Sequence, residues 1–278
     1  MQDRLSSYLR LPIIPRRMKL DFSEVLERGD VFPDNQVLTA LIATLSGVFP
    51  PGEREFIRSV RLFMAEIHDP ELLEQVELFS KQEGQHALQH RHLNEIFERL
   101  GYGTDKVAAY VEKQIQEMMT QRSPAERLAV TVVLEHYTAS LAHFALTRPE
   151  FFDSLPAAAR ELLFWHAIEE IEHKAVAFEV YQRCVGDRSL LRKAMLIELV
   201  MFPVTVIGLQ RQMLRDRGWR PNLDELLETG KFLFGRRGVF PTVLPQYLAI
   251  FRPDFHPWDF DDSELVAKWS AQLNSVVH

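Results

Sequence analysis

The sequence has a single cysteine, Cys184, in 278 residues, so no disulfide can form within the chain. Cysteine usage therefore gives no sign of an oxidising compartment, and we expect a cytoplasmic protein. Glycine (12) and proline (15) are both sparse, which excludes a collagen-like or low-complexity chain. Basic residues are not in excess, since the formal net charge is −7, and this argues against a nucleic-acid partner.

Long hydrophobic runs are also missing. Residues 1–22 are basic, but they lack the continuous apolar core and the small-residue cleavage site of a signal peptide. The most apolar stretch, 194–209, is shorter than the roughly 20 residues that cross a bilayer, and it contains Glu198 and Pro203. We expect it to form a buried or surface-docked helix. A peripheral membrane contact through 194–209 and a homodimer are both compatible with this pattern.

The patterning that is present is helical. Few stretches alternate with the period of a strand and no solenoid-type repeat is visible, so we predict an all-α fold. Hydrophobic residues make up 46% of the chain, enough for a sizeable core. We predict an irregular N-terminal arm over 1–33 and a single helical domain over 34–278. Within that domain we expect a bundle over about 50–185 and a C-terminal helical extension over about 188–278.

Turn signals set the expected helix boundaries. The segment FPPG (49–52) is predicted to separate a helix over 36–47 from a second helix over 53–67. One helix should begin at Ser123 with a capping box closed by Glu126. The remaining helices are expected over 71–99, 104–120, 124–146, 157–183, 223–234 and 238–251, and from Ser263 onward.

Two of the predicted helices carry the same pattern, Glu-x-x-His, as EGQH (83–86) and EIEH (170–173). Residues three apart share one face of a helix, so each pair can point at one spot. Ferritin-like dimetal bundles combine two such pairs with one glutamate from each of two further helices. Each Glu-x-x-His helix should then follow a helix that carries a lone glutamate.

Helix register selects those two glutamates. Among Glu53, Glu55 and Glu66, Glu53 stands 15 positions before the turn at His68, and Glu83 stands 15 after it. At about 1.5 Å per residue, an antiparallel hairpin would bring Glu53 and Glu83 level. In the second hairpin, Glu135 lies in an apolar stretch where an unpaired charge is costly, and it would come level with Glu170. Glu53 could instead complement a helix dipole, and Glu55 is expected to be a solvated neighbour.

The sequence therefore predicts a dinuclear metal site. Carboxylates are hard ligands that can bridge two cations, and with neutral imidazoles they suit two iron ions, or manganese. His90 and His166 lie on the metal-facing stripes of their helices, as extra ligands, donors or proton carriers, and are our catalytic candidates; satisfied core histidines are the alternative. Glu169 and Glu172 are either supporting partners or surface charges. The predicted ligands are Glu53, Glu83, His86, Glu135, Glu170 and His173.

Several strings resemble a bacterial family of predicted metal-dependent hydrolases, which is placed among ferritin-like proteins. The resemblance spans roughly 50–260 and implies metal residues at the same six positions, with His90 and His166 as further members of the motifs. His256 or Asp259 could reach the site, although a structural cap is the simpler interpretation. The strings are FPPGE (49–53), QEGQHALQH (82–90), LEHYTA (134–139), WHAIEEIEHKAVAFEVY (165–181) and FRPDFHPWD (251–259).

Three functions fit these residues. The first is a di-iron enzyme that uses O2 to oxidise or oxygenate a small, apolar or lipid-like substrate, because carboxylate-rich ligation stabilises oxidised iron. The second, which the family name implies, is a hydrolase with a metal-activated water, in which His90 or His166 acts as general base. The third is a non-catalytic metal-binding bundle, against which the long C-terminal extension argues. The sequence narrowly favours the first.

Overall fold

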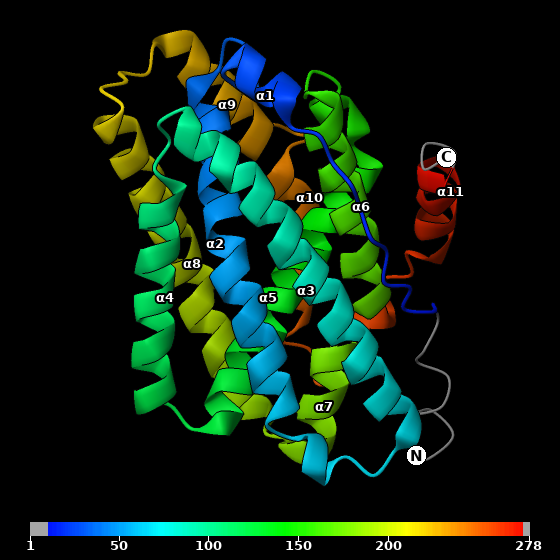
Figure 1. The fold of residues 1–278 in the computed structure, drawn as a ribbon. Coiled ribbons are helices and arrows are strands. Elements are labelled where there is room, and N and C mark those ends of the chain that lie inside the picture. The colour runs from blue at the N-terminus through cyan, green and yellow to red at the C-terminus, as the bar shows by residue number, and fades with distance from the viewer. Residues whose placement is uncertain (1–10, 275–278) are drawn as a thin grey trace.

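The computed structural model describes residues 11–274, and over that range it is built of helices without a strand, which confirms the all-α prediction (Figure 1). Two helical hairpins form its centre. In the first, α2 packs against α3, and in the second, α5 packs against α6; α2 also contacts α5, and α3 contacts α6. The bounds are α2 Gln36–Arg61, α3 Pro70–Arg99, α5 Pro124–Thr147 and α6 Ala157–His173.

Helix α2 is continuous, so the predicted break at FPPG (49–52) is wrong. Pro50 and Pro51 lie inside the helix. Pro50 has no amide proton to give to the carbonyl of Ser46, which would normally leave that oxygen unpaired. Asn94 of α3 donates to this oxygen instead, at 2.9 Å. Glu53 consequently lies mid-helix, and its alternative role at a helix N-terminus is excluded.

The predicted arm is not irregular throughout, because it contains the short helix α1 (Ser23–Arg28). Its first ten residues lie outside the described range. The extended segment before α1 crosses the outer side of α3 and α6 (Figure 1). Met18 and Phe22 are buried along it, and the side-chain amide of Gln89 donates to the Met18 carbonyl at 3.0 Å. The segment is therefore part of the packed structure.

The predicted helix over 157–183 is two helices, and this expectation is corrected. Helix α6 ends at His173 and α7 (Val176–Cys184) begins after a short turn. Lys174, in that turn, is buried and donates from Nζ to Asp262 Oδ2 at 2.6 Å. A charge buried in this way requires a partner, and the C-terminal segment supplies it. The interruption therefore coincides with a contact to residues far along the chain.

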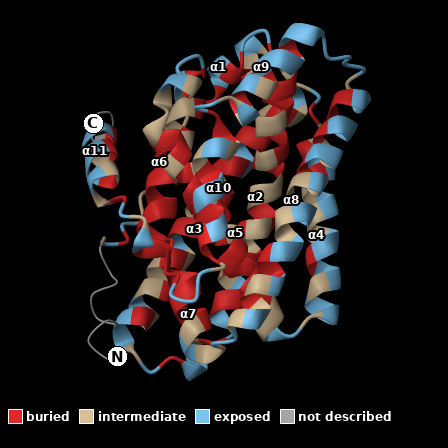
Figure 2. Ribbon diagram, turned by 180° about the vertical axis from the view of Figure 1, so that it is seen from behind, coloured by how far each residue is buried: buried red, intermediate tan, exposed pale blue. Residues whose placement is uncertain are grey.

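Further helices cover the two hairpins. Ser123 and Glu126 form the expected capping box at the start of α5. The stretch 194–209 lies within α8, and no helix in the described range is long and apolar enough to cross a membrane. Figure 2 shows that buried residues gather on the sides of the helices that face one another. The covering helices are α4 Thr104–Gln121, α8 Arg188–Asp216, α9 Leu223–Phe234, α10 Val239–Ala249 and α11 Ser263–Asn274.

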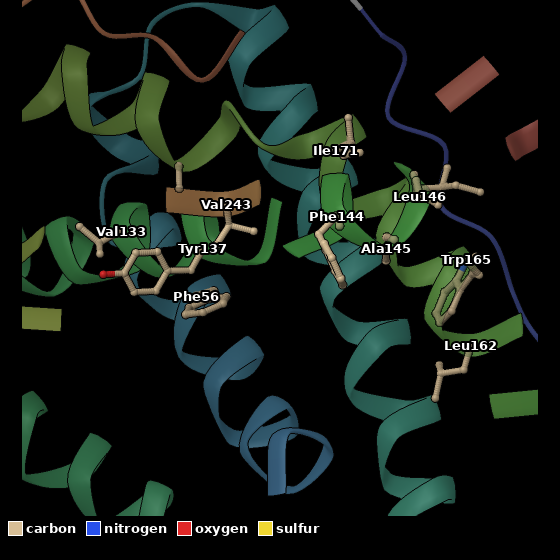
Figure 3. Close-up of a cluster of buried hydrophobic side chains, with 14 of the residues drawn as sticks. Phe56, Val133, Tyr137, Phe144, Ala145, Leu146, Leu162, Trp165, Ile171 and Val243 are labelled. Atoms are coloured by element: carbon tan, nitrogen blue, oxygen red, sulfur yellow. The ribbon is translucent and has the colours of Figure 1, made fainter. Parts of the chain in front are cut away.

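An apolar core fills the space between the central and covering helices (Figure 3). Phe56 of α2, Val133 of α5 and Ile171 of α6 are all buried in it. Water is excluded from such a core, so a charged group placed there is stable only when it is paired or bound to a cation. The carboxylates inside the bundle therefore need an explanation.

Candidate metal centre

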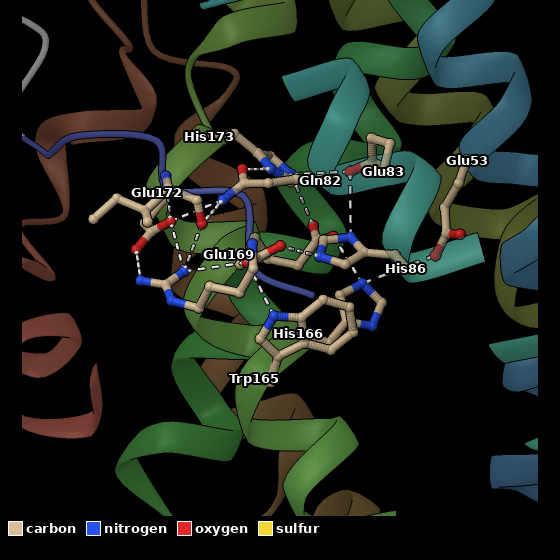
Figure 4. Close-up of polar contacts among 12 residues, drawn as sticks. Glu53, Gln82, Glu83, His86, Trp165, His166, Glu169, Glu172 and His173 are labelled. Atoms are coloured by element: carbon tan, nitrogen blue, oxygen red, sulfur yellow. Dashed lines mark hydrogen bonds and ion pairs between the residues drawn. The ribbon is translucent and has the colours of Figure 1, made fainter. Parts of the chain in front are cut away.

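All six predicted ligands meet in the middle of the two hairpins, and all are buried. Figure 4 shows four of them, Glu53, Glu83, His86 and His173. Their ligand atoms fall into two groups. Around His173, Nε2 lies 3.1 Å from Glu83 Oε1 and 3.4 Å from Glu135 Oε2. Around His86, one ligand atom each of Glu53, His86 and His166 lie within 4.8 Å of one another. We call these groups the His173 half and the His86 half.

Glu83 and Glu170 lie between the two halves. Glu83 Oε1 is 3.6 Å from His86 Nδ1 as well as 3.1 Å from His173 Nε2. Glu170 turns one oxygen to each side: Oε1 is 3.5 Å from His86 Nδ1, and Oε2 is 3.6 Å from His173 Nε2. Each of these carboxylates therefore faces both imidazoles.

Nine of the atoms that face this centre have no hydrogen-bond partner among the described residues. An unsatisfied buried polar atom costs about 1–3 kcal/mol, and more when it is charged. So many of them pointing at one place would be strongly unfavourable in a purely structural core, whereas each is a good metal ligand. The atoms are Oε1 and Oε2 of Glu53, Glu83 and Glu135, Oε2 of Glu170, Nδ1 of His86 and Nε2 of His173.

The electrostatics of the metal-free site lead to the same conclusion. Burial and the nearby charge of Glu83 raise the pKa of Glu53 well above its usual value, and they raise the pKa of Glu135 to about 8. Burial lowers the pKa of His173, but its contacts with Glu170 and Glu135 more than offset this and raise it well above normal. Two divalent cations would take the place of these protons and offset four carboxylates.

The donor chemistry also fits such cations. We call the six predicted ligands together the cage. The cage offers carboxylate oxygen and imidazole nitrogen but no sulfur, and Cys184, at the end of α7, is not part of it. Hard carboxylates with imidazole suit iron or manganese better than soft metals. The residues present therefore fit a pair of divalent ions.

His86 is held from outside the centre by a carboxylate. Its Nε2 lies 3.0 Å from Glu169 Oε2, while Nδ1 faces the centre. Glu169 Oε1 in turn accepts hydrogen bonds from Trp165 Nε1 and from the Arg16 backbone, both at 2.9 Å. A carboxylate on the outer nitrogen fixes the tautomer of a ligand imidazole and raises its basicity.

His173 is held by an amide instead. Its Nδ1 lies 2.9 Å from Gln82 Oε1, so this nitrogen carries the proton and Nε2 is left free to face the centre. Gln82 Nε2 donates to Glu172 Oε2 at 2.8 Å. Glu172 is therefore the acid at the end of this chain, one residue further from the imidazole than Glu169 is from His86.

Arg16 joins the two supports, namely Glu169 behind His86 and the pair of Gln82 and Glu172 behind His173. Its guanidinium lies 3.2 Å from Glu169 Oε1 and 2.6 Å from Glu172 Oε1. The Ile14 amide also donates to Glu172, at 3.1 Å. Glu169 and Glu172 are thus supporting partners and not surface charges. Sequence reasoning missed Arg16 and Gln82 entirely. The adjacency of Gln82 to Glu83 was the only signal for Gln82, and none existed for Arg16.

The two catalytic candidates, both buried, lie beside Glu170 on the side of the His86 half. His166 Nε2 is 2.9 Å from Glu170 Oε1, His166 Nδ1 is 3.0 Å from His90 Nε2, and His90 Nδ1 is 3.0 Å from Ser46 Oγ. Burial lowers the pKa of both imidazoles, and for His90 the neighbouring His166 lowers it further. Phe49 packs against both rings. Both histidines are buried and hydrogen-bonded, so their catalytic role stays a prediction.

The other candidates lie away from the centre. Glu55 is not a solvated neighbour, because it is buried and paired with Arg127 at 2.6 Å. Glu66 lies in a short turn at Met64–Glu66, beyond the end of α2. His256 caps the turn at Pro257–Asp259 and contacts Glu179 at 2.9 Å, so the 255–259 segment is a structural cap.

Comparison with known proteins adds one match. A family model described as "Predicted metal-dependent hydrolase" matches residues 14–261. That range contains the whole cage together with its supports, including Arg16. No curated protein and no solved structure matches the chain.

Proposed function

The chain belongs to the predicted metal-dependent hydrolases, and we propose from this premise that its buried cage binds two divalent cations and hydrolyses an ester or amide bond of a small substrate. One observation carries the proposal: nine buried ligand atoms without hydrogen-bond partners among the described residues converge on one place. Such a set is costly unless cations bind it.

The ligands divide between two positions. Glu135 and His173 would hold one cation, Glu53 and His86 the other, and Glu83 with Glu170 would contact both. Bound there, the cations would polarise a substrate carbonyl and bring the pKa of a coordinated water towards neutrality.

His166 and His90 supply a path for the proton. With Glu170 ionised, its carboxylate accepts from His166 Nε2, His166 Nδ1 accepts from His90 Nε2, and His90 Nδ1 accepts from the Ser46 hydroxyl. A proton that reaches Glu170 would reverse these contacts and could move outward through His166 and His90 towards Ser46. The small exposed fractions of the side chains support entry of the substrate from the side of His166. The side chains of His166 and Glu170 are 10% and 6% exposed, whereas those of His86 and His173 are 0% exposed.

The ring of Phe49 favours an apolar substrate group. The Phe49 ring centroid lies 4.7 Å from that of His90 and 5.2 Å from that of His166. A hydrophobic moiety that rests on this ring would keep water away from the reacting bond while leaving the imidazoles in reach.

The test combines metal analysis with a hydrolysis assay. Protein purified without added metal should contain about two divalent ions per chain by the ligand count above. Under strict anaerobiosis, and reloaded with manganese or another redox-inert ion, it should turn over chromogenic esters or anilides. The His166→Gln variant should keep the cation of the His173 half, since His166 belongs to the ligand group around His86, and should lose most of this turnover. Absence of bound metal would refute the proposal.

A second candidate rests on the ligand chemistry. A cage with four carboxylates and no thiolate suits iron and stabilises its oxidised state, which is what a di-iron enzyme acting on O2 requires. The same preparation decides between the two: stoichiometric O2 uptake by the reduced iron form, without anaerobic hydrolysis, would favour oxidation. Bound metal with neither activity would indicate a non-catalytic bundle.

A further inference from the structure

Helix α8 has an apolar face that no other part of the described chain covers. Six large hydrophobic side chains on it are between 37% and 59% exposed. Met195 and Val206, on the opposite side of the helix, are buried against the bundle. A contiguous exposed apolar surface of this kind marks an interaction site more often than a free surface. We call it the α8 stripe: Leu196, Ile197, Val200, Met201, Val204 and Ile207.

The α8 stripe is flanked by positive charge at both ends. Lys193 and Arg211 are exposed, and the positions 193, 196, 200, 204, 207 and 211 follow the three-four spacing of one helix face. Between them the only charged residue is Glu198, which is half-buried and whose pKa is raised by burial. α8 carries five Lys or Arg and two Asp or Glu, although the chain has a net charge of −7. The net charge of α8 is therefore positive, whereas that of the whole chain is negative.

Helix α10, which lies across Tyr137 from the inner side of α8, also carries exposed apolar side chains. The ring of Tyr137 on α5 lies between the two helices, 5.8 Å from Phe202 of α8 and 4.4 Å from Tyr247 of α10. Next to Tyr247, Leu244 and Leu248 are 42% and 45% exposed. Both helices lie on the side of the molecule that faces the viewer in Figure 2.

We propose that the α8 stripe docks the protein on an anionic membrane surface, with α8 lying in the plane of the interface. An interfacial helix buries an apolar face to a depth of about 5–10 Å and uses Lys and Arg to contact anionic headgroups. Lys193 and Arg211 are separated by about 27 Å along the helix, so their flexible stems can reach headgroups beyond both ends of the apolar segment.

The charges favour a bilayer over a second copy of the chain. If two α8 stripes paired about a twofold axis, the basic ends would face each other whether the helices ran parallel or antiparallel. Like charges placed together oppose association. An anionic lipid surface, in contrast, satisfies both ends at once.

The test is co-sedimentation of the full-length, metal-loaded protein with vesicles. We expect the wild-type protein to pellet with mixed phosphatidylcholine and phosphatidylglycerol vesicles, less with pure phosphatidylcholine, and less at high salt because ions screen the attraction. Val200→Asp combined with Val204→Asp should reduce pelleting at least about tenfold, since two carboxylates would enter the apolar boundary. The matched control is Leu62→Asp, at a leucine 48% exposed at the end of α2, and it should pellet like the wild type.

A second pair of variants isolates the charge. Lys193→Glu with Arg211→Glu should weaken binding to the mixed vesicles by about fivefold or more for each position and leave binding to neutral vesicles nearly unchanged. Lys81→Glu, at an exposed lysine on α3, should have no such selective effect. This contrast distinguishes specific binding to an anionic lipid surface from non-specific hydrophobic adsorption of the α8 stripe.

A direct readout does not depend on loss of binding. Val200→Cys in a Cys184→Ser background, labelled with a polarity-sensitive dye, should shift to shorter emission wavelength when mixed vesicles are added, and Leu62→Cys should not. The proposal is overturned if the wild-type protein pellets with neither vesicle, or if the aspartate variants pellet like the wild type. A concentration-dependent dimer that Val200→Asp dissociates, without vesicle binding, would also overturn it and assign the α8 stripe to a second copy.

Discussion

His86 and His173 come from the same sequence pattern but are held in opposite ways. His86 directs Nδ1 to the centre and gives Nε2 to the carboxylate of Glu169. His173 directs Nε2 to the centre and gives Nδ1 to the amide of Gln82. The repeated motif therefore places an imidazole at the site, while residues outside the motif decide which nitrogen is offered and how basic it is.

This difference predicts that the two metal positions have unequal affinities. A carboxylate makes its imidazole a stronger donor, whereas a neutral amide mainly fixes the tautomer. The His86 half also has a second imidazole, His166, within reach, and the His173 half has no second imidazole among the described residues. We expect the His86 half to bind its cation more tightly, so that the two sites fill one after the other in a titration.

The largest effect should come from the two carboxylates between the halves. Glu83→Ala or Glu170→Ala removes a group that faces both histidines, so both cations should be lost or weakened more than about 100-fold. Glu135→Ala should remove only the weaker site. Metal content and calorimetric titration measure this, with Glu95→Ala, at an exposed position of α3, as the control. A Glu83→Ala protein that still binds one cation tightly would contradict the shared role.

The next effect is on thermal stability, and it comes from protonation of Glu135 in the His173 half. The pKa of Glu135 is raised to about 8 by burial and by Glu83 in the metal-free chain. The folded chain then keeps a proton that the unfolded chain releases. The stability this contributes is present below the unfolded value and is lost as pH rises through about 8. The bound cation replaces the proton, so the gap in Tm between metal-loaded and chelated protein should widen between about pH 5 and 8.

Thermal denaturation with and without a chelator measures that gap. Glu135→Gln carries no titrating group at this position, so the contribution of Glu135 to the pH dependence should disappear and the metal-free protein should be more stable near pH 8. A Tm gap that is independent of pH in the wild-type protein would show that protons do not compete with the cations in this half.

The central site was predictable because its geometry is local. Helical spacing brings Glu83 beside His86, and equal distances from a turn bring Glu53 level with Glu83. Both arguments survive even though the helix boundary before Glu53 was placed wrongly. The continuity of α2 was not predictable from FPPG, because it requires the Asn94 side chain at the Ser46 carbonyl. The assignment of these residues as metal ligands stays a prediction.

The residues that support the two histidines could not be predicted, because their contacts also depend on residues distant in the sequence. Glu169 and Glu172 flank Glu170 in the sequence, but their burial depends on Arg16, more than 150 positions away. No periodicity connects an extended N-terminal segment to α6. The helix break after His173 was likewise not visible in the local sequence. Lys174, at this break, pairs with Asp262 of the C-terminal segment.

The supports should give an intermediate effect that separates the halves. Glu169→Gln removes the carboxylate from His86 and should weaken the tighter site by about 10-fold to 100-fold, leaving the other nearly unchanged. Gln82→Glu should not strengthen the His173 half, because the new carboxylate would lie against Glu172, where Gln82 now donates at 2.8 Å. Titration of both variants sharpens the comparison. Equal losses at the two sites in Glu169→Gln would show that the supports act as one unit.

The smallest effect should come from Arg16, and it should be symmetric. Its guanidinium contacts the acids behind both histidines, so Arg16→Lys keeps the charge but loses the forked geometry. We expect both sites to weaken by a similar factor, about threefold to tenfold, since Arg16 acts on each imidazole only through intervening residues. Arg17→Lys, at the exposed neighbour, is the matched control. If only the His86 half weakens, the amide of Gln82 holds His173 without help from Arg16, and the two supports are independent.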